Sequence, residues 1–238
     1  LEELSQKSIS HPLCISHDQQ YSEQGYLIND WQKLNQIRAQ KYELDYYFNF
    51  HDPLSYIYLV AIIHLTDYYR IKLNLCPVYL EDDIRAISNR ISLLEFSRLQ
   101  KIAQSYNLEI GPSYILSNQG LQHCLTLFYI ALQQDCAQEI SLKILENIWS
   151  LNKDFSYINH IQDLLTLLNY NTKEFKASLK TEEWRGIIEQ YTTKWLQLDL
   201  PQLPSFYLQG EKRISLCGAH RLWALEMALI EHMDSAEK

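Results

Sequence analysis

The sequence predicts an α/β fold in which a strand–helix–strand unit and a later β-hairpin with a closing helix are separated by a long helical segment. Residues 45–76 have the pattern of a strand, a helix and a second strand in turn. Residues 82–195 keep a helical period almost throughout. Residues 203–233 begin near a proline, form two short stretches around Gly210, and end in an amphipathic segment. A strand–helix–strand unit of this length implies two parallel strands with a right-handed crossover.

The first strand and the first helix meet at an Asp-Pro step. Aromatic residues alternate along residues 46–50, which suits a strand. Asp52 stands directly before Pro53, and an aspartate cap followed by proline at the first helical position is a strong helix start. Apolar residues then recur at spacings of three, four and seven over residues 54–69. Residues 71–76 alternate again and form the second strand.

A helical insertion is expected between the two parts, from about residue 81 to residue 195. Gly111-Pro112 interrupts it, because neither residue suits the interior of a helix. We expect Thr181 to cap the last helix, which reaches Trp195. The acidic triplet at 81–83 is interpreted as a capping cluster rather than as a cation site. Helical patterns cover residues 84–94, 121–132, 140–149 and 161–168.

Composition and charge argue against several classes of partner. Hydrophobic residues make up 47% of the 238 residues, enough for a sizeable core. The net charge of −8 argues against a nucleic-acid partner, which requires a basic surface. The longest apolar run, residues 56–65, is too short to span a membrane. We therefore expect neither nucleic acid nor membrane as a partner.

The five cysteines favour a reducing compartment. Their number is odd, they are scattered, and none forms a Cys-x-x-Cys pair, so neither a metal site nor a disulfide framework is indicated. Reduced, buried thiols are typical of cytoplasmic proteins. We therefore expect a cytoplasmic location and no bound metal.

Three separated parts of the chain resemble one family. The segment His51-Asp-Pro-Leu-Ser-Tyr56 is similar to the Ser-Pro-Tyr-Ser-Tyr turn of 2-hydroxychromene-2-carboxylate isomerases and kappa-class glutathione transferases. These belong to the DsbA-like branch of thioredoxin folds. Residues 141–168 resemble the helical pair of that family's insertion, with Trp149 in a matching place. Leu203-Pro-Ser-Phe206 and Gly218-Ala-His-Arg-Leu222 resemble its Val-Pro-Thr-Phe and Gly-x-Asp-Arg-Leu segments.

The resemblance implies a thioredoxin-like fold, βαβ and then ββα, with a large all-helical insertion. Residues 43–80 and 196–238 would form the thioredoxin-like domain, and residues 81–195 the inserted helical domain. Residues 1–42 lie outside the match and are either a linker or the remnant of a preceding module of the same kind. Relatives of this family are commonly dimers, so the resemblance also implies a homodimer.

The same resemblance places the chemistry at the start of the first helix. Asp52 and Ser55 occupy the two positions that hold cysteines in disulfide oxidoreductases, so dithiol–disulfide exchange is excluded there. In the isomerase and transferase branch, a serine hydroxyl at the first position faces the glutathione thiolate at the positive end of the helix dipole. Asp52 and Ser55 are therefore the expected catalytic residues.

Asp52 is the main departure from the family pattern. A carboxylate that caps a helix should have a lowered pKa. It would also repel a thiolate at ~4 Å by about 1 kcal/mol in water, and by more where the pair is shielded. Asp52 is thus either an ordinary N-cap worth about 1 kcal/mol or a general base helped by His51. Taken alone, His51 is interpreted as a solvated loop histidine.

The remaining binding residues lie in the two C-terminal segments. The family proline is cis, and the residue before it offers backbone groups to a bound thiol, a role that falls to Leu203 before Pro204. His220 replaces an acidic residue that holds the amino end of glutathione, whereas Arg221 is retained, either for binding or as a structural ion pair. The resemblance implies a glutathione site formed by His51, Leu203, Pro204, His220 and Arg221.

Two functions of different classes remain open. The first is a glutathione-dependent isomerase or transferase that acts on a small-molecule or thiol substrate. The second is a family member that has lost catalysis and serves as a binding or structural module. The intact order of elements favours the first, and the replacements at Asp52 and His220 favour the second.

Overall fold

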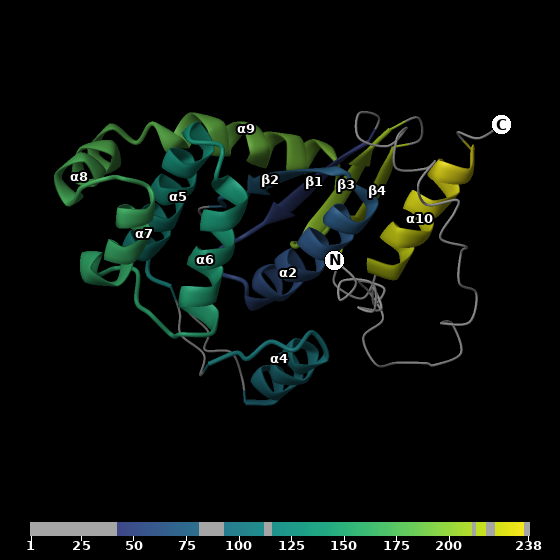
Figure 1. Ribbon diagram of the computed structural model, residues 1–238, viewed down its shortest axis with the longest axis horizontal. Helices are drawn as coiled ribbons and strands as arrows, with labels where there is room; N and C mark the ends of the chain where they lie inside the picture. Colours follow the sequence, from purple (N-terminus) through teal and green to yellow (C-terminus); the bar gives the residue numbers. More distant parts are fainter. Residues whose placement is uncertain (1–41, 81–92, 112–115, 211–212, 218–221, 236–238) are drawn as a thin grey trace, which may run out of the picture.

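The computed structural model describes residues 42–80, 93–111, 116–210, 213–217 and 222–235 (Figure 1). They form a four-stranded mixed sheet in the order β2-β1-β3-β4. The central strand β1 (Glu43–Phe48) runs parallel to β2 (Lys72–Pro77) and antiparallel to β3 (Ser205–Gln209). The edge strand β4 (Ile214–Cys217) pairs antiparallel with β3. The predicted βαβ unit and terminal hairpin are both confirmed.

One face of the sheet carries the first and the last helix of the described residues. α2 (Pro53–Tyr69) connects β1 to β2, and α10 (Leu222–Ser235) follows β4 (Figure 1). A buried hydrogen bond of 2.8 Å from the Tyr69 hydroxyl to Glu226 Oε1 joins the two helices. Between them and the sheet lies the aromatic core, in which the rings of Tyr46 and Phe206 stack at 5.4 Å.

The opposite face is covered by α9 (Trp184–Gln197), which packs against β2. Successive strand residues point to opposite faces of the sheet. Tyr47 and its neighbour Tyr46 therefore lie on different faces. Tyr47, Cys76 and Val78 form a second apolar cluster with Trp195 of α9. Both faces of the strand pair β1–β2 are therefore covered by helices.

The predicted insertion between β2 and β3 is confirmed. Its described residues form α4 (Leu93–Ser105), α5 (Asn118–Gln133), α6 (Ala137–Trp149), the short 3₁₀ helix η1 (Ile158–Ile161), α7 (Gln162–Leu167), α8 (Thr172–Thr181) and α9. Most of the helix expected over 84–94, the acidic triplet 81–83 and the segment 1–41 lie outside the described residues. The division of the chain into domains stays a prediction.

The expectation for Thr181 was wrong. Thr181 ends α8 instead of capping the next helix, because its hydroxyl donates to the carbonyl of Ser178 within the preceding turn. The cap of α8 is Asn171, whose side chain accepts two backbone N–H groups in a capping box. Glu182, with φ of 49°, then turns the chain into α9.

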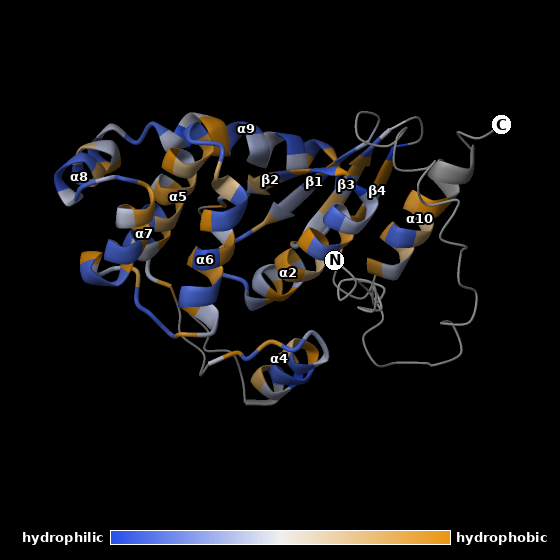
Figure 2. Ribbon diagram, viewed as in Figure 1, coloured by the Kyte–Doolittle hydropathy of each residue, from blue (hydrophilic) through white to orange (hydrophobic). Residues whose placement is uncertain are grey.

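Apolar packing attaches the insertion to the sheet domain. In Figure 2 its helices alternate orange and blue residues, as expected for amphipathic helices that bury one face. α5 packs against α6, and α6 packs against α2. Phe128, Ile144 and Leu145 are fully or almost fully buried. The insertion and the helix that starts at Asp52 thus share one core.

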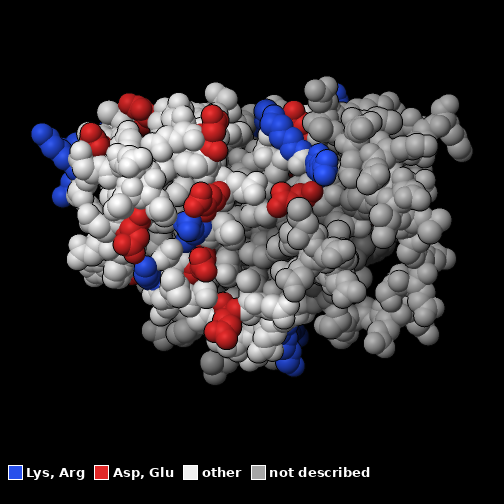
Figure 3. All heavy atoms as spheres, in the orientation of Figure 1, with Lys and Arg blue, Asp and Glu red and all other residues white. Residues whose placement is uncertain are grey.

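The described surface has mixed charge. Acidic and basic side chains are interspersed over the face shown in Figure 3. Within the described ranges, no helix is both long enough and apolar enough to cross a membrane.

Candidate functional site

The turn before α2 and the loop before β3 lie at the same edge of the sheet. Tyr47 near the end of β1 pairs with Ser205 at the start of β3. Extending this antiparallel register by one residue places Pro204 beside Phe48, at the usual strand separation of about 4.8 Å. The Leu203–Pro204 peptide bond is cis. The topology therefore brings the turn formed by residues 49–52 and the proline loop together.

Asp52 is the N-cap of α2, as the Asp-Pro step predicts. Its backbone is extended, with φ of −105° and ψ of 118°, and Pro53 occupies the first turn. Oδ1 accepts the backbone N–H of Leu54 at 3.0 Å, and Oδ2 accepts the hydroxyl of Ser55 at 3.4 Å. Both carboxyl oxygens are thus hydrogen-bonded within the first turn of the helix.

The expectation that the pKa of Asp52 is lowered was wrong. Burial raises the pKa of this carboxyl from 3.8 to about 7, although the hydrogen bonds from Leu54 and Ser55 lower it. Desolvation of the charged form therefore outweighs the stabilisation that a helix N-terminus gives to an anion. At neutral pH the Asp52 carboxyl is divided between its protonated and ionised forms, so it can both accept and release a proton.

Ser55 is held in place from three sides. It is fully buried, and its Oγ accepts the backbone N–H of Asn49 at 3.2 Å while its hydroxyl faces Asp52. The hydroxyl of Tyr46 donates to the carbonyl of Ser55 at 2.9 Å. The structure brings Asp52 and Ser55 together as expected, and it gives Ser55 the role of a fixed donor to the carboxyl group.

His51 is buried rather than solvated, so its interpretation as a solvated loop residue was wrong. Its backbone N–H donates to Asn49 Oδ1 at 2.8 Å. Only 6% of the residue is exposed, and neither ring nitrogen has a hydrogen-bond partner among the described residues. Burial lowers the pKa of His51 to about 4, which keeps the imidazole neutral at pH 7.

Two tryptophans of the insertion contact the two sides of this edge. The indole N–H of Trp149 in α6 donates to the carbonyl of Phe50 at 3.2 Å. The indole N–H of Trp195 in α9 donates to Ser205 Oγ at 3.0 Å. The helical pattern over 140–149 included Trp149, and the last expected helix reached Trp195, but no sequence signal indicated that the indole N–H groups contact the turn and the proline loop.

The C-terminal candidates are only partly described. Pro204 is buried, and Leu203 is partly buried against the cluster around Trp195. His220 and Arg221 lie outside the described residues, so their roles stay predictions.

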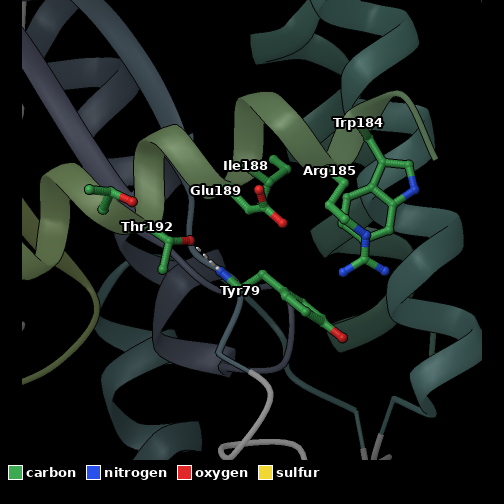
Figure 4. A pocket seen from close by; sticks show the side chains of 7 residues that line it. Tyr79, Trp184, Arg185, Ile188, Glu189 and Thr192 are labelled. Carbon is green, nitrogen blue, oxygen red and sulfur yellow. Dashed lines mark hydrogen bonds between the residues drawn. The ribbon is translucent and has the colours of Figure 1, made fainter.

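A separate pocket lies between α9 and the segment after β2 (Figure 4). Tyr79 faces Trp184 and Arg185 across it, and the Arg185 guanidinium lies 5.1 Å from the centre of the Trp184 ring. The same guanidinium pairs with Glu182 at 3.0 Å. No predicted site residue pointed to this pocket, although the adjacent tryptophan and arginine at the start of α9 are a sequence signal for it. None of the expected site residues lines it.

Metal and disulfide chemistry find no support in the described part of the chain. It contains no group of three or more His, Cys, Asp or Glu residues that could hold a metal ion. The four cysteines within it have free thiols. None of them stands at position 52 or 55, where a redox site of this fold would need them.

Comparison with known proteins identifies the family. The solved structure of a 2-hydroxychromene-2-carboxylate isomerase superposes with a TM-score of 0.63 at 18% identity, covering 79% of this chain and 94% of its own. The cytosolic disulfide reductase DsbM from Pseudomonas aeruginosa, solved with GSH, gives 0.60 at 11% identity, with 82% and 100% covered. The sequence matches none of the curated proteins. The model of the DSBA-like thioredoxin domain matches residues 43–230, and the chain therefore belongs to that family.

Proposed function

We propose that this chain is a glutathione-dependent isomerase or transferase that uses the thiol without oxidising it. The observation that supports this most strongly is the Asp52–Ser55 pair at the start of α2. Exchange between a dithiol and a disulfide needs two sulfur atoms, which a carboxyl and a hydroxyl do not supply, but these two groups form hydrogen bonds and transfer protons. The site therefore suits chemistry in which a bound thiol is deprotonated and later released.

The carboxyl of Asp52 supplies the proton acceptor. A thiol becomes nucleophilic as its thiolate, and a cysteine thiol has an ordinary pKa of about 8.5. Because burial raises the pKa of Asp52 to about 7, the two groups differ little in proton affinity. Once Asp52 holds the proton, its charge no longer repels the thiolate, and the N-terminus of α2 stabilises the remaining anion. The pair then carries one negative charge rather than two.

Glutathione is the thiol proposed here. A relative of the same fold was solved with GSH, and the motifs around Pro204 resemble those of glutathione transferases. In this proposal the backbone of Leu203 binds the cysteine part of the tripeptide, and His220 and Arg221 lie near its amino end. The second substrate is a small molecule or another thiol.

A binding module without catalysis is the second candidate. It is favoured by the hydrogen bonds of Asp52, because both carboxyl oxygens are already used in the first turn of α2. An N-cap that serves only the helix would make the same two bonds.

Calorimetric titration of reduced glutathione separates the two candidates. Three proteins are compared at about pH 6.5 and about pH 8.5: the wild type, Asp52→Asn, and the matched control Asp163→Asn at a carboxyl whose side chain is 88% exposed. We expect millimolar or tighter binding by the wild type. Its affinity should fall severalfold at the higher pH, where Asp52 and the thiol both ionise. The control should behave like the wild type, and Asp52→Asn should lose less affinity.

The other outcomes are equally informative. Binding only after substitution of Asp52 would show that the carboxyl blocks a site that is otherwise intact. Absence of binding by all three proteins would reject the glutathione-dependent enzyme and leave the binding module.

A further inference from the structure

The site contains a buried histidine that the proposed thiol chemistry does not use. His51 directly precedes the N-cap of α2, and both its ring nitrogens lack a partner among the described residues. Buried polar atoms are hydrogen-bonded in the great majority of cases, and leaving one unpaired destabilises the folded protein. An imidazole with two unpaired nitrogens beside a candidate active site is therefore a candidate for hydrogen bonding to a ligand.

The surrounding turn does not supply that partner. The backbone N–H of His51 already donates to Asn49 Oδ1, and the carbonyl of Phe50 accepts the indole of Trp149. The carboxyl of Asp52 is used by Leu54 and Ser55. The backbone of the turn is thus fixed by its own hydrogen bonds, while the capacity of the imidazole remains unused.

The charge state of His51 limits the chemistry of its partner. Burial keeps the imidazole neutral, so it offers one N–H donor and one acceptor but no positive charge for an anion. Asp52, whose Cα lies about 3.8 Å away along the chain, adds negative charge when it ionises. An uncharged oxygen atom that accepts a hydrogen bond fits this position better than a carboxylate or a phosphate does.

We propose that His51 binds an uncharged carbonyl oxygen of the second substrate, next to the sulfur atom held at Asp52, and so selects carbonyl compounds over their hydrocarbon counterparts. This inference rests on the proposed function, since it takes the bound thiol as its neighbour. A polar group built to pair with a ligand discriminates against the analogue that lacks the partner, because the polar group is then left buried and unpaired.

Two glutathione conjugates test this directly. S-phenacylglutathione carries a ketone oxygen near the sulfur, and S-(2-phenylethyl)glutathione has a CH₂ group in its place. We expect the wild type to bind the phenacyl conjugate about tenfold more tightly. His51→Leu should bind both conjugates alike, and His51→Gln, which keeps an N–H donor, should retain part of the preference. Equal affinity of the two conjugates for the wild type would overturn the proposal.

A second measurement keeps this inference separate from the proposed function and does not depend on the variants. The imidazole nitrogens of His51 are followed by NMR while acetophenone, or ethylbenzene as its hydrocarbon control, is added without glutathione. We expect the His51 signals to move with acetophenone alone. If that response occurs but neither conjugate binds, the thiol function fails and the carbonyl site stands. If the conjugates bind equally and acetophenone gives no response, the thiol site stands and the role of His51 is rejected.

Discussion

The two sides of the candidate site are built alike but carry different chemistry. The turn at 49–52 and the loop at 203–205 each receive one indole N–H from the helical insertion, from Trp149 and Trp195 respectively. The turn holds two ionisable groups, the buried His51 and the partly buried Asp52, whose pKa values are shifted by desolvation. In the loop, Pro204 is buried and Leu203 contributes an apolar side chain.

This difference shows which part of the site is tied to the fold and which part can change. β3 begins at Ser205 and pairs with the central strand, so the position of the proline loop follows from the sheet itself. Positions 52 and 55 require only a hydrogen-bond acceptor that caps α2 and a donor that pairs with it. Several residue types provide such groups. The same scaffold can therefore hold different chemistry at the turn while its core stays the same.

The largest expected effect is a loss of stability caused by a substitution in the core next to the proline loop. Phe206 follows Ser205 in β3, is fully buried, and stacks on Tyr46 of the central strand. Phe206→Ala should lower the free energy of unfolding by about 3–5 kcal/mol, because it leaves a cavity in the core. Denaturant unfolding measures this. The exposed residue Leu196 provides the control, since Leu196→Ala should change stability by only about 0.5 kcal/mol. A loss at Phe206 no larger than the control would contradict the described core.

The next effect acts on the chemistry of the turn alone. A carboxyl whose pKa is raised from 3.8 to about 7 binds its proton more tightly in the folded state. The unfolded state then holds fewer protons between these two values, so this contribution to stability falls as pH rises from about 4 to about 7. Asparagine does not titrate and is an equally good N-cap. Relative to Asp52→Asn, the wild type should therefore lose about 2–4 kcal/mol over this range.

Thermal or denaturant unfolding of both proteins across this pH range checks the prediction. His51 is present in both, so its own titration largely cancels in the comparison. A constant difference in stability between the two proteins would mean that the pKa of Asp52 is not raised. The Asp163→Asn control should show no such trend, because that side chain is exposed.

The smallest effect sharpens the comparison between the two indole contacts. Trp149→Phe and Trp195→Phe each remove one hydrogen bond and should each destabilise the protein by about 1–2 kcal/mol. Trp149→Phe should cost more, since it leaves a buried backbone carbonyl without that donor, whereas Ser205 keeps a hydroxyl that can rotate. Denaturant unfolding measures both. Trp223, which is 65% exposed, gives the control substitution Trp223→Phe. If all three variants were equally stable, the indole contacts would have no energetic role.

Local signals in the sequence predicted the helix start at the site. The burial and the pKa values of its residues depend on tertiary contacts. The N-cap at Asp52 was predictable because its partners lie within three residues. The raised pKa of Asp52 and the burial of His51 were not, since both depend on atoms packed around the turn from other elements. The contact from Trp149 to Phe50 spans 99 positions of sequence, beyond any periodic pattern. Thr181 was misplaced because a threonine hydroxyl can bond within a helix as well as cap one.

The two indole contacts also allow the intrinsic tryptophan fluorescence of the protein to report on the site. Tryptophan fluorescence depends on burial and on hydrogen bonding of the indole N–H. Trp149 and Trp195 report on opposite sides of the same site, and both are buried. Replacing the other tryptophans with phenylalanine, and then one of this pair at a time, would give two proteins whose emission reports separately on the turn and on the proline loop. A ligand that contacts only one side would then be located by which of the two signals responds.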